Sequence, residues 1–134
     1  MANSSEVNVD ATGVVIRGYD PVAYFTEGRP IPGSLELSVE YAGGKYLFAS
    51  AANRDAFKAT PEAFVPQYGG FCAFGVSIGK KFDIDPASWR IVDKKLYVNL
   101  NPAILEKWSG EVAENIQKAE KNWPQIKSKA ASEL

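Results

Sequence analysis

Glycine and proline interrupt this chain so regularly that its predicted helices and strands are short. The 134 residues include 11 glycines and 8 prolines. Asp20-Pro21 favours a helix start, but the glycines and prolines of residues 28–33 confine that helix to residues 22–26. The densest case is the segment 66–79, where four glycines alternate with aromatic residues. This density indicates positive φ or close backbone approach, and the aromatic residues predict a packed loop.

Alternation of apolar and polar residues predicts two antiparallel hairpins. Residues 35–41 place Leu35, Leu37, Val39 and Tyr41 on one face of a half-buried strand, and the chain turns back at Ala42-Gly43-Gly44 into residues 45–49. Residues 89–92 and 95–100 predict the second hairpin, and the run 14–16 suggests a further strand. Helices are expected over 50–58, 61–65, 101–108 and 111–123, and Pro124 is expected to end the last of them. The predicted fold class is α+β: two small hairpins, or one small sheet, packed with several short helices and a longer C-terminal helix.

Composition excludes several function classes. Histidine is absent, which removes the commonest general base and the commonest metal ligand. Cys72 is the one cysteine, so no intrachain disulfide and no multi-cysteine zinc or iron–sulfur site is available. The net charge of −1 gives no electrostatic footprint for nucleic acid. The chain has no apolar run of membrane-spanning length, and its first residues lack the basic and apolar regions of a signal peptide.

Cys72 is the first candidate for chemistry. As a thiolate it could ligate a metal, sense redox state or act as a nucleophile, provided that a helix N-terminus or a cation lowers its pKa. As a protonated thiol it would be a small buried apolar residue. Copper prefers at least two sulfur ligands, and the other sulfur of the chain belongs to Met1, so a monomeric copper site is not favoured. A symmetric homodimer could bring two Cys72 residues together.

Two further groups of residues have both a functional and a structural interpretation. Asp83, Asp85 and Asp93 could bind a hard cation, but they lack the spacing of a calcium loop and are more typical of solvated loops. The aromatic residues of the first half could line an apolar pocket or form the core. The predicted ligand-binding residues are the Gly/aromatic loop around Cys72 and two tyrosines that could close the pocket: Tyr68, Gly69, Gly70, Phe71, Cys72, Phe74, Tyr19 and Tyr24.

Several segments together resemble a stand-alone bacterial YHS domain-containing protein. They are Gly18–Phe25, Gly44–Ser50, Asn53–Phe57, Pro61–Phe64, Pro66–Ala73, Leu96–Asn99 and Asn122–Pro124. The resemblance covers about residues 18–124. Residues 1–17 then form an N-terminal arm, loose over residues 1–12, with the possible first strand, and residues 125–134 form a polar C-terminal tail.

The resemblance implies metal binding, of copper or another heavy metal, and an extracytoplasmic (periplasmic) location. The family is described as binding metal through cysteines and histidine around the first hairpin and helix. This chain has neither residue there and lacks the Tyr-His-Ser triplet that names the family, so Cys72 is the remaining metal ligand to consider.

Three hypotheses for the function follow. The first is a non-enzymatic domain that binds a small molecule or a metal species at the Cys72 loop. The second is a structural or protein-interaction module with no bound ligand, including a homodimer. The third is an enzyme, which is not favoured because no base stands beside a nucleophile in the sequence. We expect the first, with no nucleic-acid partner and no membrane insertion.

Overall fold

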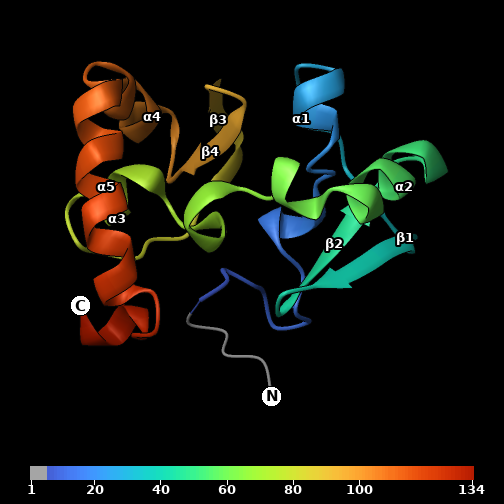
Figure 1. Ribbon diagram of the computed structural model, residues 1–134, viewed down its shortest axis with the longest axis horizontal. Coiled ribbons are helices and arrows are strands. Elements are labelled where there is room, and N and C mark those ends of the chain that lie inside the picture. Colours follow the sequence, from blue (N-terminus) through green and yellow to red (C-terminus); the bar gives the residue numbers. More distant parts are fainter. Residues whose placement is uncertain (1–5) are drawn as a thin grey trace.

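The computed structural model describes residues 6–134 and contains two separate antiparallel hairpins, with helices at both ends of the molecule (Figure 1). In chain order the helices and strands are α1 (Ala23–Thr26), β1 (Ser34–Tyr41), β2 (Gly44–Phe48), α2 (Ala51–Ala59), α3 (Ala73–Ser77), β3 (Asp85–Val92), β4 (Lys95–Asn99), α4 (Pro102–Ser109) and α5 (Val112–Ile126). Residues 6–134 also form four 3-10 turns: η1 (Ile16–Gly18) before α1, η2 (Pro61–Ala63) and η3 (Gln67–Gly70) between α2 and α3, and η4 (Ala131–Glu133) after α5. The α+β class and both predicted hairpins are confirmed.

Each hairpin is regular near its turn and irregular near its open end. β1 and β2 pair from Tyr41 with Gly44 to Ser38 with Leu47, and the register then shifts before Ser34 pairs with Phe48. The shift explains why Leu35, predicted on the buried face of the strand, is 71% exposed. Three residues of β1 between Ser34 and Ser38, Leu35 among them, have no partner in β2, and such a bulge breaks the alternation of faces.

Local signals for the helix starts are confirmed. The Ser50 hydroxyl accepts from the Asn53 amide at the start of α2, and the Asn101 side chain accepts from the Ile104 amide at the start of α4. Asp20 Oδ1 accepts from the amides of Val22 and Ala23, just before and at the start of α1. These residues satisfy amides that have no partner within the helix itself.

The segment 66–79 is more regular than the predicted loop, because it contains η3 and the helix α3. The glycine density was misleading at Gly75, which lies inside α3. A Cβ at this position would stand 2.8 Å from Phe82 Cδ2, so Gly75 serves close packing and not a turn. Gly69 does have positive φ, at 63°, and its Cα faces the backbone of Glu6.

The two ends of the chain pack more closely than predicted. In the predicted loose arm, residues 1–5 lie outside the described residues, whereas Val7 is buried and the Asn8 amide donates to the Gly69 carbonyl at 2.8 Å. Val14 and Val15 are buried but take part only in isolated bridges, so the suggested strand over 14–16 is wrong; Ile16 and Arg17 have positive φ instead. This left-handed turn ends any extended run there.

The prediction that Pro124 ends the last helix is also wrong. α5 continues to Ile126, and the Lys127 amide donates to the Trp123 carbonyl. Proline in the last turn costs one hydrogen bond, which packing can offset. The predicted polar tail therefore begins inside a helix: Ile126 is buried, and Leu134 packs against the second of two hydrophobic clusters.

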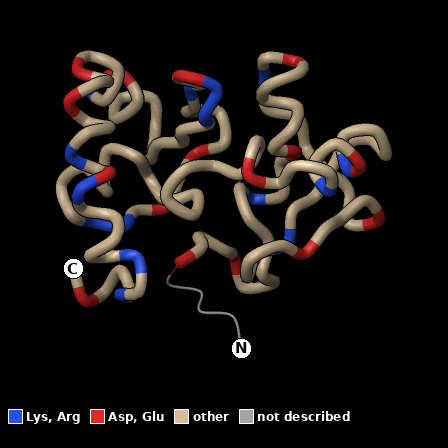
Figure 2. Tube along the Cα trace, in the orientation of Figure 1, with Lys and Arg blue, Asp and Glu red and all other residues tan. Residues whose placement is uncertain are grey.

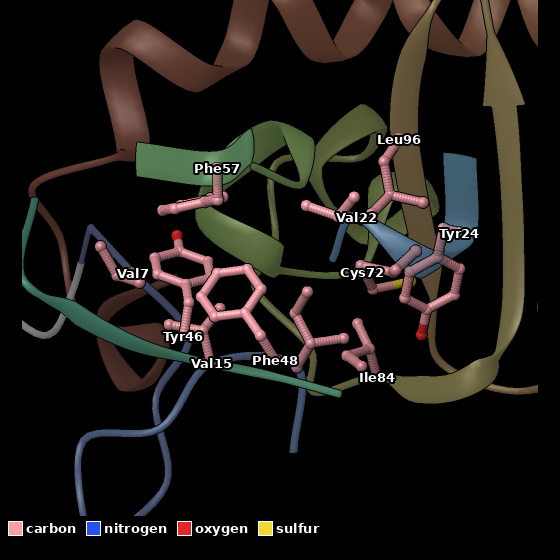
Figure 3. Close-up of a cluster of buried hydrophobic side chains, with 12 residues drawn as sticks. Val7, Val15, Val22, Tyr24, Tyr46, Phe48, Phe57, Cys72, Ile84 and Leu96 are labelled. Carbon is pink, nitrogen blue, oxygen red and sulfur yellow. The ribbon is translucent and has the colours of Figure 1, made fainter. Parts of the chain in front are cut away.

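These two clusters of side chains form the core. The first lies between the hairpins and contains Cys72 together with residues of the N-terminal segment, α1, β2, α2 and β4 (Figure 3). The second lies under α5 and contains Tyr68, Phe71, Tyr97 and Trp108. The segment from η3 to α3 contributes to both clusters and so joins the two halves of the molecule.

Lysine and arginine are intermixed with aspartate and glutamate over the described chain, as Figure 2 shows. Within residues 6–134, no helix is both long and apolar enough to cross a lipid bilayer. The prediction that the protein has no nucleic-acid partner stays a prediction.

Candidate functional site

Cys72 lies inside the first hydrophobic cluster and is fully buried. Its sulfur accepts hydrogen bonds from the Gly75 amide at 3.5 Å, where it caps α3, and from the Leu100 amide at 3.2 Å. Asn99 Oδ1 stands 3.5 Å from the sulfur and also accepts from the Phe74 amide. Burial raises the pKa of the Cys72 thiol although these amides oppose the shift. The protonated, structural role of Cys72 therefore fits better than the reactive thiolate.

The other residues predicted at this site lie in different surroundings. Tyr24 is buried beside Cys72 in the cluster, with its hydroxyl donating to the Pro86 carbonyl at 2.7 Å (Figure 3). Tyr19 is a half-buried residue at the edge of the same cluster. Phe71 packs on Trp123 in the second cluster, and Phe74 contacts both clusters. These side chains act as core here.

The donors around Cys72 do not fit a metal ion. Within residues 6–134, no group of three or more cysteine, aspartate or glutamate side chains converges on one point. Of the three aspartates considered above, Asp83 pairs with Arg17 at 2.6 Å, Asp85 accepts from the Ala87 amide and the Ser88 hydroxyl, and Asp93 lies at the turn between β3 and β4. Met1 lies outside the described residues.

Two of the predicted residues, Tyr68 and Gly69, instead line an open cleft at the tip of the first hairpin. The cleft has a volume of about 210 Å³. Its walls come from the N-terminal segment, the β1–β2 turn, β2 and the chain from η2 to η3: Val7, Tyr41, Ala42, Tyr46, Glu62, Val65, Pro66, Gln67, Tyr68 and Gly69. This volume suits a ligand of a few heavy atoms or one functional group of a larger one.

Glu62 and two tyrosines form the polar part of the cleft. The Tyr41 hydroxyl donates to Glu62 Oε2. This hydrogen bond, together with burial and the carboxylate charge, raises the pKa of Tyr41. Burial and the nearby Glu62 carboxylate also raise the pKa of Tyr46. Both phenols are therefore protonated at neutral pH, and Glu62 is the one formally charged side chain among the lining residues.

Local structure fixes the three sides of this cleft. The Ala42-Gly43 turn sets Tyr41 and Tyr46 on the hairpin, where both rings pack against Phe57 at centroid distances of 5.9 and 4.9 Å. Pro61 starts η2 and so places Glu62 in a fixed turn. Tyr68 has a left-handed backbone with φ 57°, which is rare outside glycine and asparagine. A strained backbone of this kind is often found at binding sites.

A second cleft of about 210 Å³ lies near the N-terminal segment, against Arg17 and Asp83. Its charged groups already satisfy one another. Arg17 pairs with Asp83 and donates to the Ile84 carbonyl, and the Asn8 amide group donates to Asp83 at 3.0 Å. Because of these internal contacts, the second cleft offers a ligand fewer unpaired polar groups than the first cleft, where the Glu62 carboxylate is available.

Comparison with protein families distinguishes the two clefts. The YHS domain family model matches residues 22–68. The chain is a YHS domain-containing protein. No curated protein and no solved structure matches it significantly. In the cleft at the hairpin tip, all lining residues but Val7 and Gly69 fall within the YHS match, whereas every residue that lines the second cleft falls outside it. The YHS segment thus lines the cleft at the hairpin tip and not the cleft at Arg17 and Asp83.

Glu62 and Gln67 were not predicted as site residues. Tyr41 was predicted on a strand face, and Tyr46 among the aromatic residues that could line a pocket or form the core. The available signal was weak, because Pro61-Glu62 indicates only a helix start. Nothing in the spacing of Tyr41, Glu62 and Tyr68 brings them together. Their proximity depends on how η2 and η3 cross the tip of the hairpin.

Proposed function

We propose that this YHS domain-containing protein is a non-enzymatic binding domain that takes a small ligand in the cleft at the tip of the β1–β2 hairpin. One observation supports it most: the YHS segment supplies nearly all of the cleft's walls. The cleft combines aromatic side chains with one carboxylate and amide and phenol groups, which is the composition expected of a selective small-ligand site. The binding site thus moves from Cys72 to the adjoining residues Tyr68 and Gly69.

The first test is native mass spectrometry of protein purified without a metal-affinity step, compared with its denatured mass. A non-covalent mass excess is expected, and its size distinguishes a metal from an organic ligand. A copper-sized excess that Cys72→Ala abolishes would contradict the cleft and support the metal interpretation.

The second test locates the site. A fragment library is titrated into ¹⁵N-labelled protein, and amide shifts are mapped onto the structure. We expect shifts at residues 41–46 and 67–69. If every binding fragment instead shifts residues around Arg17 and Asp83, or if none binds, the proposed site is wrong.

Two finer predictions accompany this proposal. The alternative of an interaction module predicts concentration-dependent sedimentation, or a partner in pull-downs, and a strict monomer without partners counts against it. The extracytoplasmic location implied by the family predicts that the native protein is released with the periplasmic fraction of the cells that make it, and its retention with the cytoplasm contradicts that location.

A further inference from the structure

We propose that the ligand of this cleft carries a small organic cation, a primary or alkylated ammonium group, that lies between the Glu62 carboxylate and the Tyr41 ring. This inference rests on the proposed function and names the ligand class for the same site. It follows from the charge, the ring surface and the hydrogen-bonding capacity of the lining residues.

Charge is the first argument. Glu62 is the one formally charged residue of the described lining, and no lysine or arginine within residues 6–134 is ion-paired with it. Tyr41 and Tyr46 stay neutral to well above neutral pH because their pKa values are raised. The local field is therefore negative, and it attracts cations and repels anions.

Ring surface is the second argument, and it separates organic cations from metal ions. Tyr41 and Tyr46 both line the cleft, and packing against Phe57 holds their rings in place. Tyr46 is buried, so the half-buried Tyr41 supplies the accessible ring. The faces of such rings attract an ammonium group placed within about 6 Å of the ring centroid. A hard metal ion instead takes about six oxygen ligands, and the cleft offers one carboxylate.

The orientation of the carboxylate is the third argument. The Tyr41 hydroxyl donates to Glu62 Oε2, and the structure records no partner among residues 6–134 for Oε1. The phenol thereby fixes the rotamer of the glutamate and leaves one carboxylate oxygen for a ligand. A primary or partly alkylated ammonium group could donate an N–H to that oxygen, while a quaternary ammonium group would rely on charge and ring contact alone.

The experiment compares choline with its neutral isostere 3,3-dimethyl-1-butanol, at constant ionic strength, by amide shifts of ¹⁵N-labelled protein. Choline is expected to shift residues 41–46 and 67–69, and the neutral alcohol to bind at least about tenfold more weakly. Glu62→Gln removes the charge and keeps the size, and it should weaken choline binding by about tenfold or more. Glu36→Gln, on the exposed face of β1, is the matched control and should leave choline binding unchanged.

The outcomes separate this inference from the proposed function. Equal shifts from choline and the neutral alcohol, or choline binding that survives Glu62→Gln, overturn the cation and leave the cleft as a ligand site. Cleft binding by other fragments of the library, but not by choline or methylammonium, does the same. If neither the cations nor any fragment shifts residues 41–46 and 67–69, both proposals fall.

Discussion

The surroundings of Cys72 and the cleft at Glu62 share one stretch of chain, because η3 lines the cleft and Cys72 follows directly as the N-cap of α3. The two regions differ in how their polar groups are satisfied. Around Cys72, the sulfur and the Asn99 carbonyl oxygen accept backbone amides, and the thiol is fully buried. In the cleft, the Glu62 carboxylate has the Tyr41 hydroxyl as its recorded partner and faces solvent. The contacts of the sulfur stabilise the fold, although the buried Asn99 Nδ2 has no hydrogen-bond partner among residues 6–134. The Glu62 carboxylate leaves capacity for a ligand.

The difference shows that an unusual residue in an unusual loop is weak support for a binding site. Cys72 stands out in the sequence because it is the one thiol, but its sulfur is hydrogen-bonded by backbone amides of the same chain. Glu62 is one of many glutamates and stands out only in three dimensions. Substitutions at internally satisfied groups should therefore lower stability, and substitutions in the cleft should lower binding with little effect on stability.

The largest expected effect is at Asp20, the most fully satisfied buried group. Its carboxylate is completely buried and accepts from the amides of Val22, Ala23 and Ala49 and from the Asn53 side chain. Asp20→Ala leaves these donors without their partner and should lower the free energy of unfolding by about 3 kcal/mol or more. Urea denaturation measures it. Asp20→Asn, which keeps one acceptor oxygen, should lose less, and an equal loss in both would show that the contacts do not act separately.

Lys81 tests whether a charged side chain can also be satisfied by groups within the fold. Its ammonium donates to the carbonyls of Lys127 and Lys129 and lies 5.1 Å and 5.3 Å from the centroids of Phe71 and Trp123. Lys81→Met keeps the apolar stem but removes these contacts, so we expect a loss of about 2 kcal/mol.

The matched control for Lys81 is Lys121→Met, on the exposed side of α5, which should change stability by less than about 0.5 kcal/mol. Hydrogen exchange should become faster at the end of α5 in Lys81→Met. If Lys81→Met and Lys121→Met unfold at the same urea concentration, the contacts of Lys81 contribute no more to stability than those of an exposed lysine, and the prediction is wrong.

Much of the fold could be predicted because its signals are local. Ser50 and Asn101 begin helices through contacts three residues away, and the turn at Ala42-Gly43 closes the first hairpin. The predictions failed where a distant part of the chain decides the structure. Gly75 favours a loop in the sequence, but in the structure it lies in a helix because Phe82 packs against it. Pro124 predicts a helix end, but the helix continues because Ile126 is packed in the interior.

The candidate site was predicted only in part for the same reason. Tyr68 and Gly69 were included because glycine and aromatic residues alternate there, and they do line the cleft. Glu62 and Tyr41 lie 21 residues apart in the sequence and meet through one hydrogen bond. A single sequence does not reveal such a pair, because Tyr41 is an ordinary strand residue and Glu62 is an ordinary residue at a helix start.

Cys72→Ala should have a moderate effect on stability and none on the cleft. It removes the acceptor that caps α3, which should lower the free energy of unfolding by about 1 kcal/mol. Because the pKa of the folded thiol is raised, the native state holds the proton more tightly than the unfolded state does. The stability that this group contributes is therefore complete below the ordinary thiol pKa and is lost as pH rises above about 9.

Denaturation at several pH values tests this: the wild type should lose more stability than Cys72→Ala between pH 8 and about 10, and cleft binding should be the same in both. Rapid alkylation of the native thiol at neutral pH would contradict its buried, protonated state and return Cys72 to the list of functional residues.

The smallest expected effect on stability, and the sharpest on the cleft, comes from Glu62→Gln. The glutamate is exposed, so unfolding should change by less than about 0.5 kcal/mol. The pKa of Tyr41 should fall toward its ordinary value, because the hydrogen bond to the carboxylate is the main cause of its rise. An alkaline absorbance titration measures this change, with Tyr41→Phe identifying the Tyr41 signal. If Glu62→Gln leaves the Tyr41 titration unchanged, the carboxylate is not held by the phenol in solution, and the cleft loses the feature that distinguishes it from an ordinary charged surface.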